Sequence, residues 1–117
     1  MIQLKTTGKL PKTYPYPLQC WRVGDLLWLS MGGEVVVDYS LQFKKSFGPR
    51  TWVTSYANDV MAYIPSRRVL REGGYEGGGA MRYTRSTPHP GPWAESIEQR
   101  LVAVSYTHLT LPTICSV

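Results

Sequence analysis

Cysteine, histidine and long apolar runs are all scarce in this chain, and each scarcity excludes a class of structure or site. The 117 residues include two cysteines, Cys20 and Cys115, without a CxxC pair, so a disulfide framework is not expected. They include two histidines, whereas a catalytic zinc site usually takes three protein ligands, most of them His. No run of about 18 apolar residues occurs, so we expect no membrane-spanning helix. A complete catalytic zinc site is therefore not expected from this chain alone.

Acidic residues are fewer than basic ones, with 8 Asp and Glu against 13 Lys and Arg, and the net charge is +5. The basic residues form two pairs, Lys44–Lys45 and Arg67–Arg68, and are otherwise scattered. Because nucleic-acid binding needs a basic surface, often interleaved with aromatics, we expect no nucleic-acid partner and interpret the charge as solvated surface. No protein partner is indicated. The first residues lack the apolar segment of a signal peptide, and the compartment stays open.

The first half of the chain has the pattern of a hairpin followed by a helix and a strand. Residues 18–23 alternate in strand fashion, Gly24-Asp25 is a turn signal, and 26–31 is an apolar run of buried-strand length. A helix is predicted from about Glu34 to Phe47, and residues 51–56 predict another strand. The apolar face of that helix is formed by Val36, Tyr39, Ser40, Phe43 and Phe47.

Strand, helix and strand in this order predict a βαβ unit. The fold class is therefore α/β, a fragment of a mixed sheet with flanking helices. Reactive groups in open α/β sheets gather beyond the carboxyl ends of the strands. Two segments have that position, residues 32–34 and 58–63, and parallel pairing would bring both to the same rim.

The second half is predicted to be less regular. Residues 64–92 are mostly loop, because Gly73–Gly79 is too rich in glycine for a helix or a stable strand. A short strand is expected at 81–83. A last helix opens at Pro92, with an apolar face of Trp93, Ile97 and Leu101.

Residues 104–117 differ in composition from the preceding helix and are expected not to continue it. The stretch resembles a tail of translated adapter sequence that recurs on unrelated proteins. We therefore assign residues 1–103 to the domain proper and 104–117 to a non-native tail. His108 and Cys115 are excluded as functional candidates on this ground.

Glu34 and Tyr63 are the leading candidates for chemistry. Glu34 follows two glycines, which permit close approach of a ligand or metal, and the start of a helix would favour its charge. The alternative is an ordinary first-turn glutamate. Tyrosine seldom binds metal, and its hydroxyl is more often just the polar end of a half-buried ring, which is the alternative for Tyr63. Asn58 and Asp59 are typical of a turn or helix cap, and a loop histidine such as His89 is more often structural than a ligand.

Three motifs resemble those of the neutral/alkaline non-lysosomal ceramidase family, particularly its bacterial ceramidase-like members. They are Gly33-Glu34, the stretch Asn58-Asp59-Val60-Met61-Ala62-Tyr63-Ile64-Pro65-Ser66, and the glycine-rich run around Tyr75-Glu76. The resemblance covers about residues 10 to 103. In that family two histidines, a glutamate and a tyrosine hold a zinc ion, which implies that Glu34 and Tyr63 are zinc ligands here. The histidines and a serine implicated in amide hydrolysis belong to earlier parts of the catalytic domain and have no counterpart in this chain.

The resemblance implies a C-terminal fragment of a zinc-dependent amidase. Its parent would hydrolyse the N-acyl bond of ceramide or a related lipid with zinc-activated water, and the fragment alone would be inactive. Tyr75 and Glu76 would line the substrate entrance, or belong to a plain surface loop. Apolar faces that the missing portion covers would be exposed. Two alternatives stay open: a small non-catalytic interaction domain, and a different metallohydrolase on the same scaffold.

Overall fold

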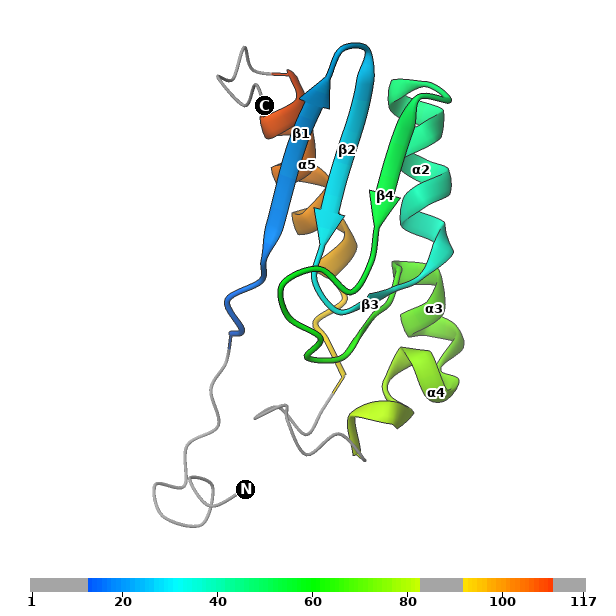
Figure 1. Ribbon diagram of the computed structural model, residues 1–117. Coiled ribbons are helices and arrows are strands. Elements are labelled where there is room, and N and C mark those ends of the chain that lie inside the picture. Colours follow the sequence, from blue (N-terminus) through cyan, green and yellow to red (C-terminus); the bar gives the residue numbers. More distant parts are fainter. Residues whose placement is uncertain (1–12, 83–91, 111–117) are drawn as a thin grey trace.

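A computed structural model describes residues 13–82 and 92–110, which form an α/β arrangement around a small mixed sheet (Figure 1). Strands β1 (Leu18–Val23) and β2 (Leu26–Met31) form the predicted antiparallel hairpin around a turn in which Gly24 has a φ of +62°. Helix α2 (Val37–Phe47) then leads to β4 (Thr51–Thr54), which pairs in parallel with β2. The predicted hairpin, βαβ unit and fold class are therefore confirmed.

A second, two-stranded sheet lies beyond the carboxyl end of the first. It pairs β3 (Glu34–Val35) in parallel with β5 (Tyr63–Ile64). The remaining elements are α3 (Arg67–Glu72), α4 (Gly74–Gly77), the 3-10 helix η1 (Gly79–Arg82) and α5 (Ile97–Thr110). No helix among the described residues is long and apolar enough to cross a membrane.

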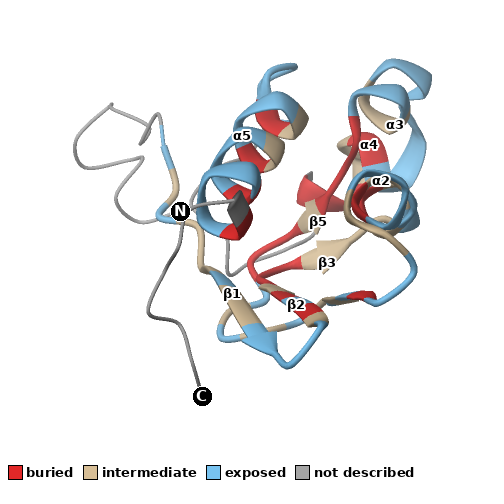
Figure 2. Ribbon diagram, turned by 90° about the horizontal axis from the view of Figure 1, so that it is seen from above, coloured by how far each residue is buried: buried red, intermediate tan, exposed pale blue. Residues whose placement is uncertain are grey.

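The core lies between the inner face of the three-stranded sheet and the helices α2 and α5 (Figure 2). Along β2 every second side chain faces inward, as the strand period requires. The core residues from β2, α2, the segment of β5 and α5 are Leu27, Leu29, Met31, Tyr39, Phe43, Met61, Ile64, Ile97, Leu101 and Leu109. The prediction that β2 is the well-buried strand is confirmed.

The predicted start of the first helix was wrong. Glu34 and Val35 are extended, and the helix begins at Val37, after Val36 with a φ of −70° and a ψ of +152°. The backbone N–H of Val36 donates to the Ile64 carbonyl at 3.2 Å, so strand pairing holds this segment extended. The predicted helical face is nevertheless right at Tyr39 and Phe43, which are buried.

The prediction of a loop over 64–92 was also wrong for its described part. Ser66 caps α3 by accepting a hydrogen bond from the Val69 N–H at 3.3 Å. Part of the glycine-rich run forms α4. Its last residue, Gly77, packs closely on α3, since an added Cβ would lie 2.7 Å from the Val69 carbonyl oxygen, and only glycine permits that packing. Met81 lies in η1 and not in a strand. Tyr83 and His89 lie outside the described residues.

The last helix differs from the prediction at both ends. It begins at Ile97 and not at Pro92, and it continues through Thr110, so the expected break at 104 was wrong. The buried face of α5 continues past residue 104, because residues four apart lie on the same side of a helix and Leu101, Ser105 and Leu109 are all buried. The assignment of 104–117 as a non-native tail stays a prediction, and Cys115 lies outside the described residues.

Candidate functional site

The strand pair β3–β5 places Glu34 and Tyr63 side by side. The two residues are directly paired in the parallel register, and the Glu34 N–H donates to the Ala62 carbonyl at 2.9 Å. Residues in register on neighbouring strands present their side chains on the same face of a sheet. The predicted convergence of residues 32–34 and 58–63 is therefore confirmed, and the metal role of both residues stays a prediction.

The two glycines before Glu34 serve this pairing. A Cβ on Gly33, which has a φ of +72°, would lie 2.7 Å from the Ala62 carbonyl oxygen and 2.7 Å from Ile64 Cγ1. A Cβ on Gly32 would lie 2.6 Å from Pro17 Cγ. We predicted that the two glycines leave room for a ligand or metal. That prediction was wrong, because other segments of the chain itself fill the space beside them.

The Tyr56 and Tyr63 hydroxyls lie near the Glu34 carboxylate, and its interaction with each phenol raises the pKa of both. Partial burial, then the hydrogen bond to Glu34 and the charge of Glu34, raises the pKa of Tyr63 above its ordinary value. The hydrogen bond to Glu34 is the main cause that raises the pKa of Tyr56. The carboxylate that both phenols face belongs to strand β3 and not to a helix start.

Tyr56 is a member of the site that the sequence did not reveal. It is the non-glycine residue with a φ of +61° just after β4, a conformation that few aromatic residues adopt. Its N–H donates to the Gly33 carbonyl at 2.9 Å, and the Ser55 hydroxyl donates to the same carbonyl at 3.0 Å. No sequence signal predicts a left-handed tyrosine, and the pattern had placed Tyr56 at the end of the strand.

The two predicted substrate residues lie next to Tyr63. The rings of Tyr63 and Tyr75 are 5.4 Å apart between centroids and meet edge to face at 72°. Glu76 is close enough for its charge to contribute to the raised pKa of Tyr63. The structure thus gathers all four predicted site residues at one place, with Tyr75 more than half exposed.

Asn58 and Asp59 have the turn role that the sequence favoured. Asn58 has a φ of +66°, and its amide donates to the Gln19 side chain at 3.2 Å. The Asp59 carboxylate accepts a hydrogen bond from the Tyr14 hydroxyl, which raises the pKa of Tyr14. Both residues tie the 58–63 segment to the start of the sheet, and this positions Tyr63.

The donor set fits part of a zinc shell. A carboxylate and a phenol lie together, and a second phenol, that of Tyr56, lies near the same carboxylate. In the part of the chain that the structure describes, no group of three or more His, Cys, Asp and Glu is placed to hold a metal ion. Glu34 and Tyr63 offer one carboxylate and one phenol, fewer than the three protein ligands that a catalytic zinc site usually takes.

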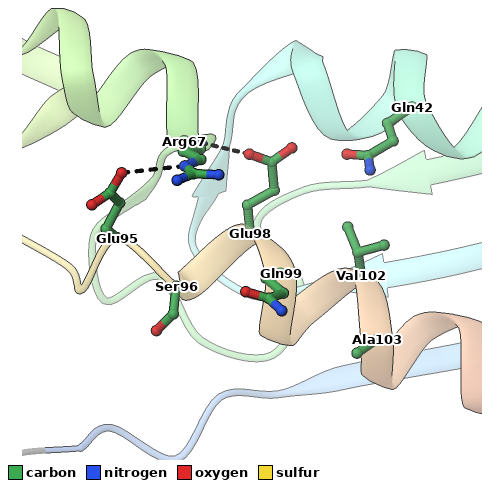
Figure 3. Close-up of a pocket in the computed structure, with 8 residues that line it drawn as sticks. All are labelled: Gln42, Arg67, Glu95, Ser96, Glu98, Gln99, Val102 and Ala103. Atoms are coloured by element: carbon green, nitrogen blue, oxygen red, sulfur yellow. Dashed lines mark hydrogen bonds and ion pairs between the residues drawn. The ribbon is translucent and has the colours of Figure 1, made fainter.

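Two pockets lie away from this cluster. The larger, of about 790 Å³, opens between α2, α3 and α5 (Figure 3). Its charged residues already have partners within the chain, because Arg67 Nε contacts Glu95 at 3.2 Å and the backbone N–H of Arg67 donates to Glu98 at 2.6 Å. The smaller, of about 280 Å³, lies beside Tyr14, Tyr16 and Trp93. Neither pocket is lined by Glu34 or Tyr63.

Comparisons of the chain with protein-family models, with curated proteins and with solved structures found no match. The resemblance to the ceramidase family consequently rests on the motifs quoted above. What the structure adds is independent of that resemblance: it shows which of the motif residues share one site.

Proposed function

We propose that this chain is part of the catalytic domain of a zinc-dependent amidase that hydrolyses the N-acyl bond of ceramide or a related lipid. The observation that supports the proposal is the direct pairing of Glu34 with Tyr63 across β3 and β5. These two residues are 29 positions apart in sequence (63 − 34), and the motif resemblance singles out both as zinc ligands. Their adjacency is what a shared metal shell requires.

Glu34 and Tyr63 would hold the zinc from one side. Glu34 and Tyr63 are paired in register, and the Glu34 carboxylate is near enough to raise the pKa of Tyr63, so the two oxygen donors are already close before a metal binds. When bound, the zinc would polarise the amide carbonyl and lower the pKa of a water molecule. Tyr63 would lose its proton on metal binding, and the ordered backbone around Glu34 would limit the entropy lost in forming the site.

Tyr75 and Glu76 would border the path to this site. Tyr75 offers an exposed ring against Tyr63, which suits the apolar chain of a lipid, and Glu76 offers a carboxylate at the same edge. The two histidines and the serine that the resemblance implies for the family would come from a longer gene product. The present chain is accordingly proposed to be inactive in isolation.

A structural role for Glu34 is the competing account, because its interactions with Tyr56 and Tyr63 would also stabilise a non-catalytic interaction domain. The two accounts differ in what a neutral isostere does. Glu34→Gln keeps the size and much of the hydrogen bonding but removes the charge that a zinc ion needs.

The test uses a longer gene product that contains this chain, assayed for zinc content and for release of fatty acid from an N-acyl sphingoid lipid. Glu34→Gln and Tyr63→Phe are expected to lower turnover by more than about 100-fold, since even outer-shell partners of metal ligands cost about 10- to 100-fold. Glu72→Gln, on an exposed carboxylate of α3, is the matched control and should retain activity. Unchanged zinc content and turnover in Glu34→Gln would contradict the proposal and favour the interaction domain.

A further inference from the structure

Three tryptophans form a row across the three-stranded sheet. Trp21 of β1 is paired in register with Trp28 of β2, and Trp28 is paired with Trp52 of β4. Residues in register across a sheet project from the same face, so the three indoles lie beside one another. Figure 1 looks onto the face of β1, β2 and β4 that carries them.

This face is open in the described part of the chain. Trp28 is 38% exposed and Trp52 58% exposed, whereas the inward residues Leu29 and Met31 are fully buried. Figure 2 shows the helices α2, α3, α4 and α5 on the opposite side of the sheet. The side chains directed to the open face, which we call the tryptophan face, are Gln19, Trp21, Val23, Leu26, Trp28, Ser30, Trp52 and Thr54.

The tryptophan face carries no ionisable side chain, although the chain as a whole has a net charge of +5. Covering it therefore removes no charge from water. The Trp28 indole N–H donates to the Thr54 hydroxyl at 2.7 Å, which satisfies its polar atom within the face. Indole rings favour the boundary between lipid and water, and a cationic protein is attracted to an anionic membrane surface.

The size of the face decides between a bilayer and a second copy of the chain. Six residues of strand span about 20 Å and three strands about 10 to 15 Å, so the face covers a few hundred Å². A stable protein–protein interface needs about 800 Å² from each partner. A single-stranded nucleic acid would need cationic side chains beside the aromatic rings, and the face has none. A bilayer surface needs neither a large matched area nor bound phosphates.

We propose that the tryptophan face docks peripherally on an anionic lipid bilayer, with Trp21, Trp28 and Trp52 entering the interface between headgroups and acyl chains. The docking depends on the composition of the face and on the net charge, and it requires no zinc and no catalysis. It would bring a lipid-hydrolysing site to the surface on which its substrate is dissolved. Its failure would leave the proposed amidase function untouched.

The test mixes the 117-residue chain with vesicles of phosphatidylcholine alone or mixed with phosphatidylserine, without zinc or N-acyl lipid. Three of the four tryptophans lie on the tryptophan face, so indole fluorescence reports on it directly. We expect co-sedimentation and a blue shift with the anionic vesicles, both weakened by salt. The double variant Trp28→Ser/Trp52→Ser is expected to lower the partition coefficient about tenfold or more.

The matched control is Val37→Ser/Leu41→Ser, which removes two apolar side chains of α2 that are more exposed than Trp28 and Trp52, and it should leave partitioning unchanged. Brominated lipids test the wild-type chain without any substitution, and quenching of its indole fluorescence is expected. Equal partitioning of the tryptophan variant, or no quenching by brominated acyl chains, would overturn the proposal. So would a wild-type dimer that the tryptophan substitutions dissociate and that does not bind vesicles.

Discussion

At the residue scale, the backbone around Glu34 is fixed by groups from two other segments. The Glu34 N–H is bound by Ala62, the Val35 N–H by the Ser55 hydroxyl at 2.8 Å, and the Gly33 carbonyl by Tyr56. Such local order costs little further entropy when a ligand binds. The carboxylate position is thus set by strand pairing and by the turn after β4.

Gly33 is the residue on which this arrangement depends most. Gly33→Ala is expected to destabilise the fold by about 3 kcal/mol, because the added Cβ would meet Ala62 and Ile64 at 2.7 Å in a left-handed conformation. Gly24→Ala is the matched control, since Gly24 has a similar φ of +62° but nothing within 4 Å of the added atom. It is expected to cost about 1 kcal/mol. Equal losses in urea unfolding would show that crowding at Gly33 has no effect.

The sequence was sufficient for part of the candidate site. The family resemblance singled out Glu34 and Tyr63, and parallel pairing predicted that the segments carrying them meet at one rim of the sheet. The hydrogen-bonding role of Tyr56 could not, since a positive φ at tyrosine depends on contacts with Gly33 that only the folded chain makes. The helix-start argument for Glu34 failed for the same reason: tertiary pairing overrode a local helical period.

At the element scale, α2 and α3 are joined through one carboxylate. Asp38, in the first turn of α2, accepts hydrogen bonds from Arg68 at 2.9 and 3.0 Å and from the buried Ser66 hydroxyl. The hydrogen bonds from Arg68 and then Ser66 lower the pKa of Asp38 below its ordinary value. Ser66 also caps α3, so one network orients both helices.

Asp38→Asn is expected to remove part of the pH dependence of the free energy of unfolding. Because the pKa of Asp38 is lowered in the folded chain, its contribution is present above the unfolded pKa of about 3.9 and is lost as the pH falls through the folded value. The free energy of unfolding of the wild type should exceed that of Asp38→Asn by about 1 kcal/mol at pH 7, and the two values should converge at low pH. Glu72→Gln, on the exposed partner of Arg68, should show a difference below about 0.5 kcal/mol. If urea titrations gave the same difference in unfolding free energy between wild type and Asp38→Asn at every pH, this account would be contradicted.

The elements that could be predicted are those with a strong internal period. The hairpin, α2 and β4 follow from alternation and from a helical face. The strands β3 and β5 have two residues each and exist only through their pairing, so no local pattern announces them. Helix α4 escaped prediction because its one close contact, that of Gly77 with the Val69 carbonyl of α3, is made only in the folded chain, whereas local helix propensity disfavours glycine.

At the scale of the whole molecule, the fold has one covered and one open sheet face. Parallel strands are usually buried on both faces, and β2 and β4 are covered here on one side by α2 and α5 in the described chain. Trp28 and Trp52 are exposed on the open face, and the expectation that a missing portion covers apolar faces of this chain stays a prediction. The size of that exposure could not be predicted, because alternation along a strand does not say which strands are neighbours.

The continuation of α5 past residue 103 makes a second test at this scale. Leu109→Ala is expected to destabilise the chain by about 2 kcal/mol, because Leu109 is 9% exposed and packs in the core. Val104→Ala, at a position 46% exposed on the same helix, should cost less than about 0.5 kcal/mol. Equal effects on the urea midpoint would show that the burial of Leu109 adds nothing to the stability of the fold.

The most direct test of the central claim is a zinc titration of the 117-residue chain, followed by the ultraviolet difference spectrum of ionised tyrosine. The account predicts weak binding of zinc with loss of a tyrosine proton, since the two ligands are only part of a shell. Glu34→Gln and Tyr63→Phe should each weaken binding about tenfold or more and abolish the tyrosine signal, and Glu72→Gln should change neither. Binding of equal strength, with an equal tyrosine signal, in all four proteins would contradict the claim that Glu34 and Tyr63 form one metal site.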